Sequence, residues 1–231
     1  MKTIGLIGGM SWESTIPYYQ IINETVRARL GGLHSAKLVL NSVEFHEIER
    51  LQHQGAWREA GEAMAQAALS MQAAGADFLV LCTNTMHKVA EAMEQAVSIP
   101  LLHIADPTAE AIRAQGLERV GLLGTRFTME ETFYRGRLQD RHGLQVAIPA
   151  PADREEVHRV IFEELCLGRV LDPSRGRFRE IIQRLADQGA QGVILGCTEI
   201  AMLVTDADSP IPLFDTTRLH ALRAVDWSLE A

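Results

Sequence analysis

Two stretches of the chain place reactive and hydrogen-bonding side chains directly after a short apolar run. The first is Leu79-Val-Leu-Cys-Thr-Asn-Thr-Met-His87, and the second is Val193-Ile-Leu-Gly-Cys-Thr-Glu-Ile200. Such apolar runs are typical of buried strands, and ligands bind at the carboxyl ends of strands in open α/β sheets. A thiol has a reference pKa of about 8.5, which a helix N-terminus lowers. Cys197 precedes an expected helix, so we predict that it takes or gives protons.

An internal repeat relates the two stretches. Three pairs of segments correspond in the same order at nearly one spacing: Ile4-Gly-Leu-Ile-Gly8 with Val120-Gly-Leu-Leu-Gly124 (121 minus 5 gives 116), Gly75-Ala76 with Gly189-Ala190 (189 minus 75 gives 114), and Ile99-Pro-Leu101 with Ile211-Pro-Leu213 (211 minus 99 gives 112). Three ordered correspondences predict two similar structural units.

The repeat also decides which side chain of the first stretch is functional. Thr83 takes the place of Cys197, and Asn84 takes the place of Thr198. Cys82 matches Gly196 instead, and it should point to the other face of the strand because successive side chains alternate. We therefore interpret Cys82 as a small core side chain.

The elements that position these residues alternate between strand and helix along the whole chain, which predicts parallel sheets. We expect an α/β protein of two similar lobes related by a pseudo-two-fold axis, with the active site between them. The first lobe should comprise residues 1–103 and 211–231, and the second residues 104–210. Capping boxes are expected at Thr128 with Glu131 and at Asp153 with Glu156.

Composition excludes several classes of function. The 231 residues carry a net charge of -8 without a basic stripe, which argues against nucleic acid or an anionic membrane as the partner. The apolar runs are far shorter than the roughly 18 residues of a membrane span. Three cysteines without metal-ligand spacing fit a reducing compartment. We expect a cytoplasmic protein without a signal peptide, and we consider a homodimer as its assembly.

The chain resembles the aspartate/glutamate racemase superfamily, and within it most closely the bacterial broad-specificity amino-acid racemases. The resemblance spans essentially the whole chain, and four motifs carry it: Gly8-Gly-Met-Ser11, Thr83-Asn-Thr-Met-His87, Gly124-Thr125 and Gly196-Cys-Thr-Glu-Ile200. It implies a site between two lobes and two cysteines as acid and base. It implies neither pyridoxal phosphate nor a metal, and a small-molecule amino acid as the substrate.

One departure from the family pattern changes the expected chemistry. The first motif of the family begins with a cysteine, and Thr83 stands in its place here. A threonine hydroxyl is too weak an acid to serve as an alkoxide base without strong activation, but it can donate or relay a proton. We hypothesise that the Cys197 thiolate removes the α-proton and that Thr83, alone or through a water, protonates the opposite face. The resemblance implies that Cys197 faces the L-enantiomer.

The remaining candidate residues bind the substrate. Asn84, Thr85, Thr198 and Glu199 follow the two strands at expected helix N-termini, where backbone N–H groups suit an α-carboxylate and developing negative charge. The resemblance adds Met10 and Gln52 as substrate-contacting positions.

Substrate preference is expected to be broad. Aspartate-specific relatives carry a lysine where this chain has Cys166, which weakens the case for an acidic substrate. Two other functions stay open. One is a decarboxylase or cis-trans isomerase of the same superfamily that works with a single cysteine. The other is a non-catalytic protein that binds small ligands.

Overall fold

The computed structural model describes residues 1–230, and the chain divides into two compact units. The first comprises Met1–Ile104 and His220–Ala231, and the second comprises Ala105–Leu219. The chain therefore passes between units twice, after Ile104 and after Leu219. The second passage lies inside helix α11 (Thr216–Leu229), whose first turn belongs to the second unit.

The first unit contains a four-stranded sheet in the order β2-β1-β3-β4, in which every neighbouring pair is parallel. Its strands are β1 Ile4–Gly8, β2 Leu38–Ser42, β3 Phe78–Leu81 and β4 Leu101–Leu102. The two central strands, β1 and β3, are apolar and fully buried, as expected for parallel strands covered on both faces.

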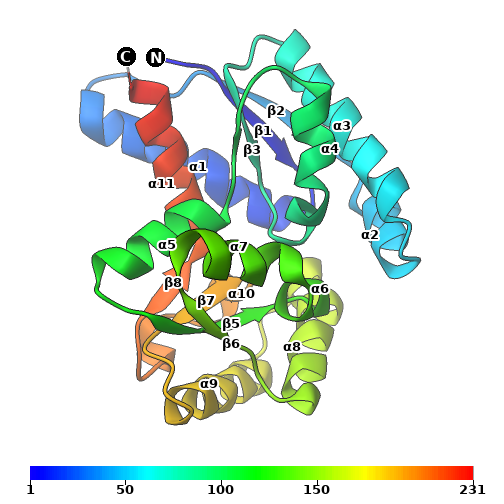
Figure 1. The fold of residues 1–231 in the computed structure, drawn as a ribbon. Coiled ribbons are helices and arrows are strands. Elements are labelled where there is room, and N and C mark those ends of the chain that lie inside the picture. Colours follow the sequence, from blue (N-terminus) through cyan, green and yellow to red (C-terminus); the bar gives the residue numbers. More distant parts are fainter. Residues whose placement is uncertain (231) are drawn as a thin grey trace. The chain divides into compact units, whose positions relative to one another are not determined.

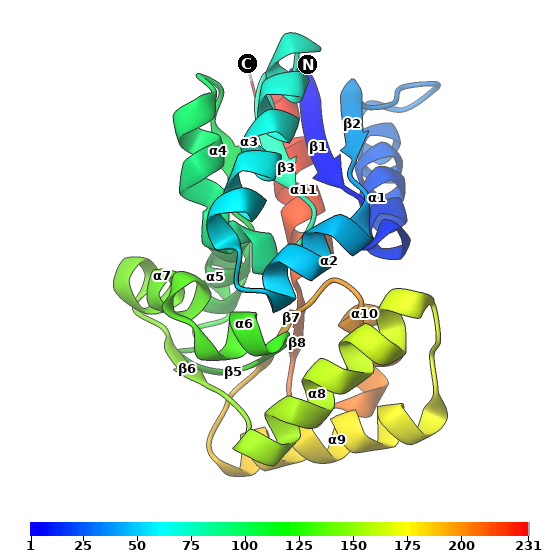
Figure 2. The same cartoon turned by 90° about the vertical axis from the view of Figure 1, so that its right-hand side faces the viewer.

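Helices cover both faces of this first sheet (Figures 1 and 2). Besides α11, the first unit contains α1 Trp12–Leu30, α2 Phe45–His53, α3 Trp57–Ala73, the 3₁₀ helix η1 Thr85–Val89 and α4 Ala90–Ala96. Two apolar cores result. One joins the sheet to α2, α3 and α4, and the other joins it to α1 and α11.

The second unit contains a four-stranded parallel sheet in the order β6-β5-β7-β8. Its strands are β5 Arg119–Gly124, β6 Gln145–Ala147, β7 Val193–Gly196 and β8 Leu213–Asp215. Each strand occupies the same place in the order as its counterpart in the first sheet. The predicted α/β fold with two similar parallel sheets is therefore confirmed.

Helices pack around the second sheet, where α8 and α9 pack against β5 and α5 packs against β8. The helices are α5 Ala105–Ala114, α6 Arg126–Glu130, α7 Thr132–His142, α8 Pro151–Glu163, η2 Leu165–Leu167, α9 Asp172–Asp187, α10 Ile200–Leu203 and η3 Asp206–Asp208. Two helices relevant to the site, α6 and α10, are only one turn long.

The expected return point to the first lobe, at residue 211, is wrong. Strand β8 pairs with β7, so residues 211–219 belong to the second unit. The apolar Ile211-Pro-Leu213 segment completes the second sheet in the way that Ile99-Pro-Leu101 completes the first.

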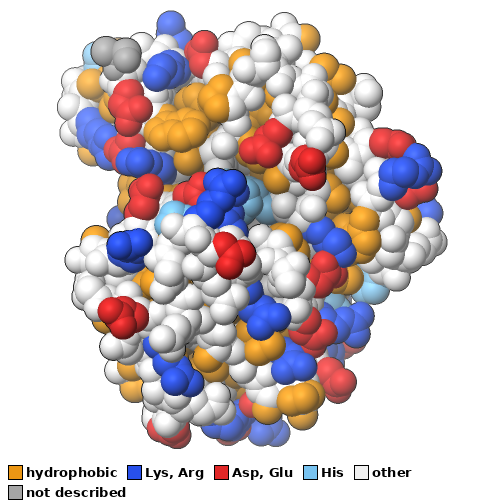
Figure 3. Space-filling view, in the orientation of Figure 1, with side chains coloured by type: hydrophobic (Ala, Val, Ile, Leu, Met, Phe, Trp, Pro, Cys, Tyr) orange, Lys and Arg blue, Asp and Glu red, His pale blue; other side chains and the backbone are white. Residues whose placement is uncertain are grey.

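Acidic and basic side chains are interspersed over the face shown in Figure 3. Within residues 1–230, no helix combines the length and apolar character needed to cross a membrane.

Candidate active site

The loop after β3 carries three of the predicted site residues, and hydrogen bonds within the first unit hold it. The Thr83 backbone N–H donates to the Leu81 carbonyl oxygen at 2.9 Å, and the His87 N–H donates to the Asn84 carbonyl oxygen at 3.1 Å. Thr83, Asn84 and η1 residue Thr85 are all buried. The chain therefore leaves β3 in a fixed conformation with polar side chains gathered at the carboxyl end of the strand.

Cys82 and Thr83 have different surroundings although they are adjacent. Cys82 is fully buried in the apolar core against α1 and α11, together with Phe78 and Val80 of the same strand. Burial raises the pKa of the Cys82 thiol far above its ordinary value. Leu79 and Leu81 lie in the other core, as the alternation of strand side chains predicts.

The Thr83 hydroxyl is accessible in a way that the Cys82 thiol is not. Thr83 is 7% exposed, whereas Cys82 is 0% exposed. Among residues 1–230, we find no hydrogen bond made by the Thr83 hydroxyl. That hydroxyl is therefore available to a ligand.

Met10 and Gln52 lie around the same loop. Met10 is buried in the core that also contains Met86, the residue after Thr85. Gln52 of α2 is buried, and its Nε2 donates to the Met86 sulfur at 3.1 Å. The structure thus brings α2 into contact with the loop that follows β3.

A tight turn after β1 fixes the position of Met10. Gly9 has a φ of 89°, and a Cβ there would lie 2.4 Å from the Val43 carbonyl oxygen, so a side chain does not fit. Its N–H donates to the Thr15 hydroxyl at 2.9 Å. Gly9 is therefore required by this turn and by its contact with the chain after β2.

The second unit places three predicted site residues after β7. Cys197 is 7% exposed, and its thiol donates to Glu199 Oε2 at 3.0 Å. The Thr198 hydroxyl donates to the same oxygen at 2.8 Å. Glu199 is itself buried. One carboxylate oxygen therefore accepts hydrogen bonds from both neighbouring side chains, a pairing that the sequence did not indicate.

The electrostatic surroundings of Cys197 contradict the expected lowering of its pKa. Burial raises the pKa of the Cys197 thiol well above its ordinary value, and the negative charge of Glu199 raises it further. Cys166 and the hydrogen bond to Glu199 act in the same direction. The helix that follows, α10, has only four residues, so it supplies little dipole to oppose them. The raised pKa favours the neutral thiol.

Glycines let the strand ends of the second sheet approach closely. A Cβ on Gly124 would lie 2.7 Å from the Gly196 carbonyl oxygen, and one on Gly196 would lie 2.8 Å from the Leu123 carbonyl oxygen. Thr125 then begins α6, and its hydroxyl accepts from the Thr128 N–H at 3.3 Å. The motif residues Gly124 and Thr125 thus shape the strand edge from which Cys197 projects.

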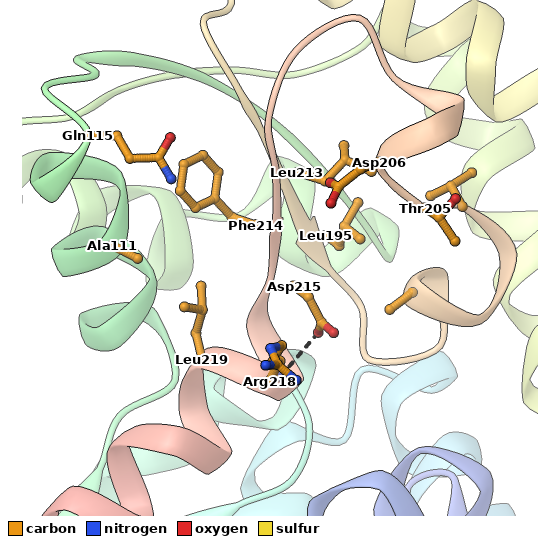
Figure 4. A pocket seen from close by; sticks show the side chains of 12 residues that line it. Ala111, Gln115, Leu195, Thr205, Asp206, Leu213, Phe214, Asp215, Arg218 and Leu219 are labelled. Carbon is orange, nitrogen blue, oxygen red and sulfur yellow. Dashed lines mark hydrogen bonds between the residues drawn. The ribbon is translucent and has the colours of Figure 1, made fainter. Parts of the chain in front are cut away.

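The second unit also contains a separate cavity of about 420 Å³ (Figure 4). Its walls include Leu195 of β7 and Phe214 of β8, and Asp215 and Arg218 lie at its polar side. The Asp215 carboxylate accepts from the Arg218 backbone N–H at 3.2 Å. None of the predicted site residues is among the twelve that line it. The cavity thus excludes Cys197, although Leu195 of the same strand lines it.

Comparison with known proteins supplies an independent observation. The family model described as Asp/Glu/Hydantoin racemase matches residues 7–224. The broad-specificity amino-acid racemase RacX of Bacillus subtilis (strain 168) is 24% identical over 231 residues, which is 98% of each chain.

Solved structures give the same result. The crystal structure of a Yersinia pestis protein assigned to the Asp/Glu racemases is 57% identical, with a TM-score of 0.92 over all of both chains. An aspartate racemase homologue from Pyrococcus horikoshii OT3 is 32% identical, with a TM-score of 0.84, also over all of both chains.

Proposed function

The chain belongs to the Asp/Glu/hydantoin racemase family, and from this premise we propose that it is a cofactor-independent amino-acid racemase in which Cys197 and Thr83 act on opposite faces of Cα. The observation that carries the proposal is the hydrogen bond from the Cys197 thiol to Glu199 Oε2. It pairs a buried nucleophilic atom with a proton acceptor at the carboxyl end of a parallel strand.

The first step transfers two protons. Glu199 Oε2 accepts the proton of the Cys197 thiol, and the resulting thiolate removes the α-proton of the L-enantiomer, which becomes a carbanion. Coupling both transfers means that Cys197 need not be a thiolate at rest, in agreement with its raised pKa. A positioned acid or base of this kind contributes about 10²–10⁴-fold to a rate.

The second step protonates the opposite face of the carbanion. The Thr83 hydroxyl gives its proton to Cα, directly or through a water, and then recovers a proton from solvent. Glu199 releases the proton that it accepted to solvent, which restores the starting pair of Cys197 thiol and Glu199 carboxylate. An α-carbanion is a stronger base than an alkoxide, so this direction suits a hydroxyl. The reverse reaction, in which Thr83 removes an α-proton, is slower because it requires an alkoxide. We therefore expect faster initial rates from L-substrates than from D-substrates, with an unchanged equilibrium.

The substrate carboxylate binds to the polar groups beside these two residues. Asn84 and Thr85 are buried after β3, and Thr198 is buried after β7. The helices that begin there, η1 and α10, have five and four residues. Hydroxyl, amide and backbone N–H donors therefore contribute more to carboxylate binding than a helix dipole does.

We expect the range of substrates to include neutral amino acids. Cys166 stands where aspartate-specific relatives carry a lysine, so the chain lacks that cation at this position. RacX, a relative named for broad specificity, matches almost the whole chain. Both observations support a broad range of substrates that includes neutral side chains.

A panel of pure L- and D-amino acids in deuterated buffer tests the proposal. We expect inverted product that carries deuterium at Cα, with full activity after treatment with EDTA and with hydroxylamine, a reagent for carbonyl cofactors. Cys197→Ala should remove the activity. Full racemisation by that variant would contradict the assigned role of Cys197.

Two results would indicate the other functions. A decarboxylase is the second candidate, because only one of the two proposed acid/base residues is a cysteine. Loss of CO₂ from a substituted malonate, without α-proton exchange of any amino acid, would indicate this function. Binding of amino acids with neither exchange nor inversion at high protein concentration would indicate a non-catalytic binding protein.

A further inference from the structure

His87 of η1 is hydrogen-bonded to the backbone of Thr83. Its Nδ1 lies 2.7 Å from the Thr83 carbonyl oxygen, and the Ile104 backbone N–H donates to its Nε2 at 3.2 Å. Because Nε2 accepts a hydrogen bond, the proton of the neutral ring is assigned to Nδ1. The ring therefore donates to the Thr83 carbonyl, and both hydrogen bonds are satisfied by one tautomer.

The surroundings of His87 restrict any movement of its ring. The side chain is buried. Its ring centroid lies 4.3 Å from that of His103 and 6.1 Å from that of His220. His220 is in turn fixed by Tyr18, whose hydroxyl lies 2.9 Å from its Nδ1. His220 of α11 and His103 of the chain after β4 thus flank the ring.

The position of the Thr83 hydroxyl depends on its backbone. The Thr83 N–H is bonded to Leu81 and the Thr83 carbonyl to His87, so the peptide groups on both sides of Cα are held. Within residues 1–230 we find no hydrogen bond that fixes the hydroxyl itself. Because threonine is β-branched, its χ1 is restricted and the hydroxyl follows the backbone.

We propose that His87 is a positioning residue for the proton transfer at Thr83. By donating from Nδ1 to the Thr83 carbonyl, it holds the hydroxyl at one place relative to the end of β3. This inference rests on the proposed function, in which Thr83 protonates the second face of Cα. A misplacement of about 1 Å can cost about 10²-fold in rate.

The exchange-to-inversion ratio of an L-substrate in deuterated buffer isolates this step. After Cys197 takes the α-proton, the carbanion is either protonated by Thr83, which gives inversion, or regains a solvent-derived deuteron from Cys197, which gives exchange without inversion. Displacement of Thr83 should therefore raise the ratio, whereas a general loss of folded enzyme lowers both rates together.

Three variants separate the two hydrogen bonds of His87. His87→Asn places an amide N–H near the Nδ1 position and keeps the bond to Thr83, but it does not reach Ile104. His87→Gln extends toward the Nε2 position and loses the bond to Thr83. His87→Leu removes both bonds. We expect the ratio to rise about tenfold or more in the last two variants and to stay near the wild-type value in His87→Asn.

Tyr18→Phe is the control for stability, because it removes a buried hydrogen bond to His220 and leaves the Thr83 carbonyl bonded. It should lower the free energy of unfolding without changing the ratio. An unchanged ratio in His87→Gln, or an equal rise in His87→Asn, would overturn the proposal. If His87→Leu does not fold, the comparison of Asn with Gln decides. Absence of both exchange and inversion in the wild type would instead reject the proposed function.

Discussion

The Cys197 thiol and the Glu199 carboxylate are joined by a hydrogen bond of 3.0 Å, so the acidity of the thiol depends on the residue two positions along the chain. The carboxylate stabilises the protonated thiol, yet it also lies where it can accept the thiol proton. Stabilising the protonated thiol slows the reaction, whereas accepting its proton speeds it. A single substitution separates these two effects.

Glu199→Gln should make Cys197 more reactive toward alkylation and less effective in racemisation. Removing the negative charge lowers the Cys197 pKa, although burial still keeps it raised. Alkylation by iodoacetamide at pH 8, followed by mass spectrometry of the Cys197 peptide, should be faster than in the wild type. Racemisation should fall by about 10²–10⁴-fold because the proton acceptor is lost. Slower alkylation, or unchanged racemisation, would contradict the account.

Cys82→Ser should lower stability and spare the reaction. The hydroxyl would enter an apolar core in which the side chain is 0% exposed, at a cost of about 1–3 kcal/mol. Urea unfolding measures this cost, and the rate per folded molecule should equal that of the wild type. Thr83→Ser offers the matched comparison, since it keeps the hydroxyl at the neighbouring position. If Cys82→Ser lost activity at full stability while Thr83→Ser kept its activity, Cys82 would be the reacting residue instead of Thr83.

The close approach of strands β5 and β7 fixes the backbone position from which Cys197 follows β7. Their last paired residues are Gly124 and Gly196, and a side chain on either would meet backbone atoms of the other strand. Backbone atoms of a paired strand cannot move without moving the strand itself.

Gly124→Ala should therefore destabilise the protein by about 1–3 kcal/mol and lower activity in the molecules that remain folded. A Cβ there would lie 2.7 Å from the Gly196 carbonyl oxygen. Gly176→Ala in α9 is the control, because a Cβ there meets no atom within 4 Å and alanine favours a helix by about 0.5–1 kcal/mol. Equal stability of the two variants in urea would show that the strand approach is not constrained as described.

Helices α5 and α7 are joined by a half-buried ion pair. Arg137 donates to both carboxylate oxygens of Asp106, at 2.7 and 2.6 Å, and His142 lies 3.0 Å from one of them. Burial alone would raise the pKa of Asp106, but the hydrogen bonds and charges of Arg137 and His142 together lower it below its ordinary value.

Asp106→Asn should cost about 1–3 kcal/mol at pH 7, measured by urea unfolding. Because the folded-state pKa of Asp106 is lowered, its contribution is complete above the unfolded pKa of about 3.9 and is lost as the pH falls through the folded-state value. The difference between wild type and variant in the free energy of unfolding should therefore narrow as the pH falls below about 3.9. A difference that stays constant over that range would contradict the ion pair.

Over the whole molecule, the internal repeat predicted the architecture well. Alternating strands and helices and three ordered correspondences identified the two sheets, whose strand orders are equivalent. The boundary expected at residue 211 did not follow the repeat, which pairs Ile211-Pro-Leu213 with Ile99-Pro-Leu101 and thereby assigns it to the second unit. The pairing of β8 with β7 agrees with the repeat.

Predictions from short sequence patterns were wrong for the capping boxes and for the pKa of Cys197. The expected capping boxes do not occur. Asp153 accepts from Arg184, 31 residues away, and the N-cap of α6 is Thr125 rather than Thr128. The raised pKa of Cys197 likewise comes from burial and from Glu199, neither of which a helix start reveals. The sequence therefore indicates which residues are candidates for the site, whereas it did not indicate the direction in which the pKa of Cys197 is shifted.

The two units supply unequal groups to the proposed reaction. Thr83 belongs to the first unit and Cys197 to the second. The corresponding strands β3 and β7 are thus followed by a hydroxyl, of Thr83, and by a thiol, of Cys197. In the proposed reaction each proton transfer depends on a different unit. Racemisation requires both, but α-proton exchange of an L-substrate requires only the second.

The most direct test compares exchange and inversion of one L-amino acid in deuterated buffer for wild type, Thr83→Ala and Cys197→Ala. We expect both processes in the wild type, exchange with almost no inversion in Thr83→Ala, and neither in Cys197→Ala. Nuclear magnetic resonance follows loss of the α-proton, and chiral chromatography follows inversion. Inversion at the wild-type rate in Thr83→Ala, or exchange at the wild-type rate in Cys197→Ala, would contradict this expectation.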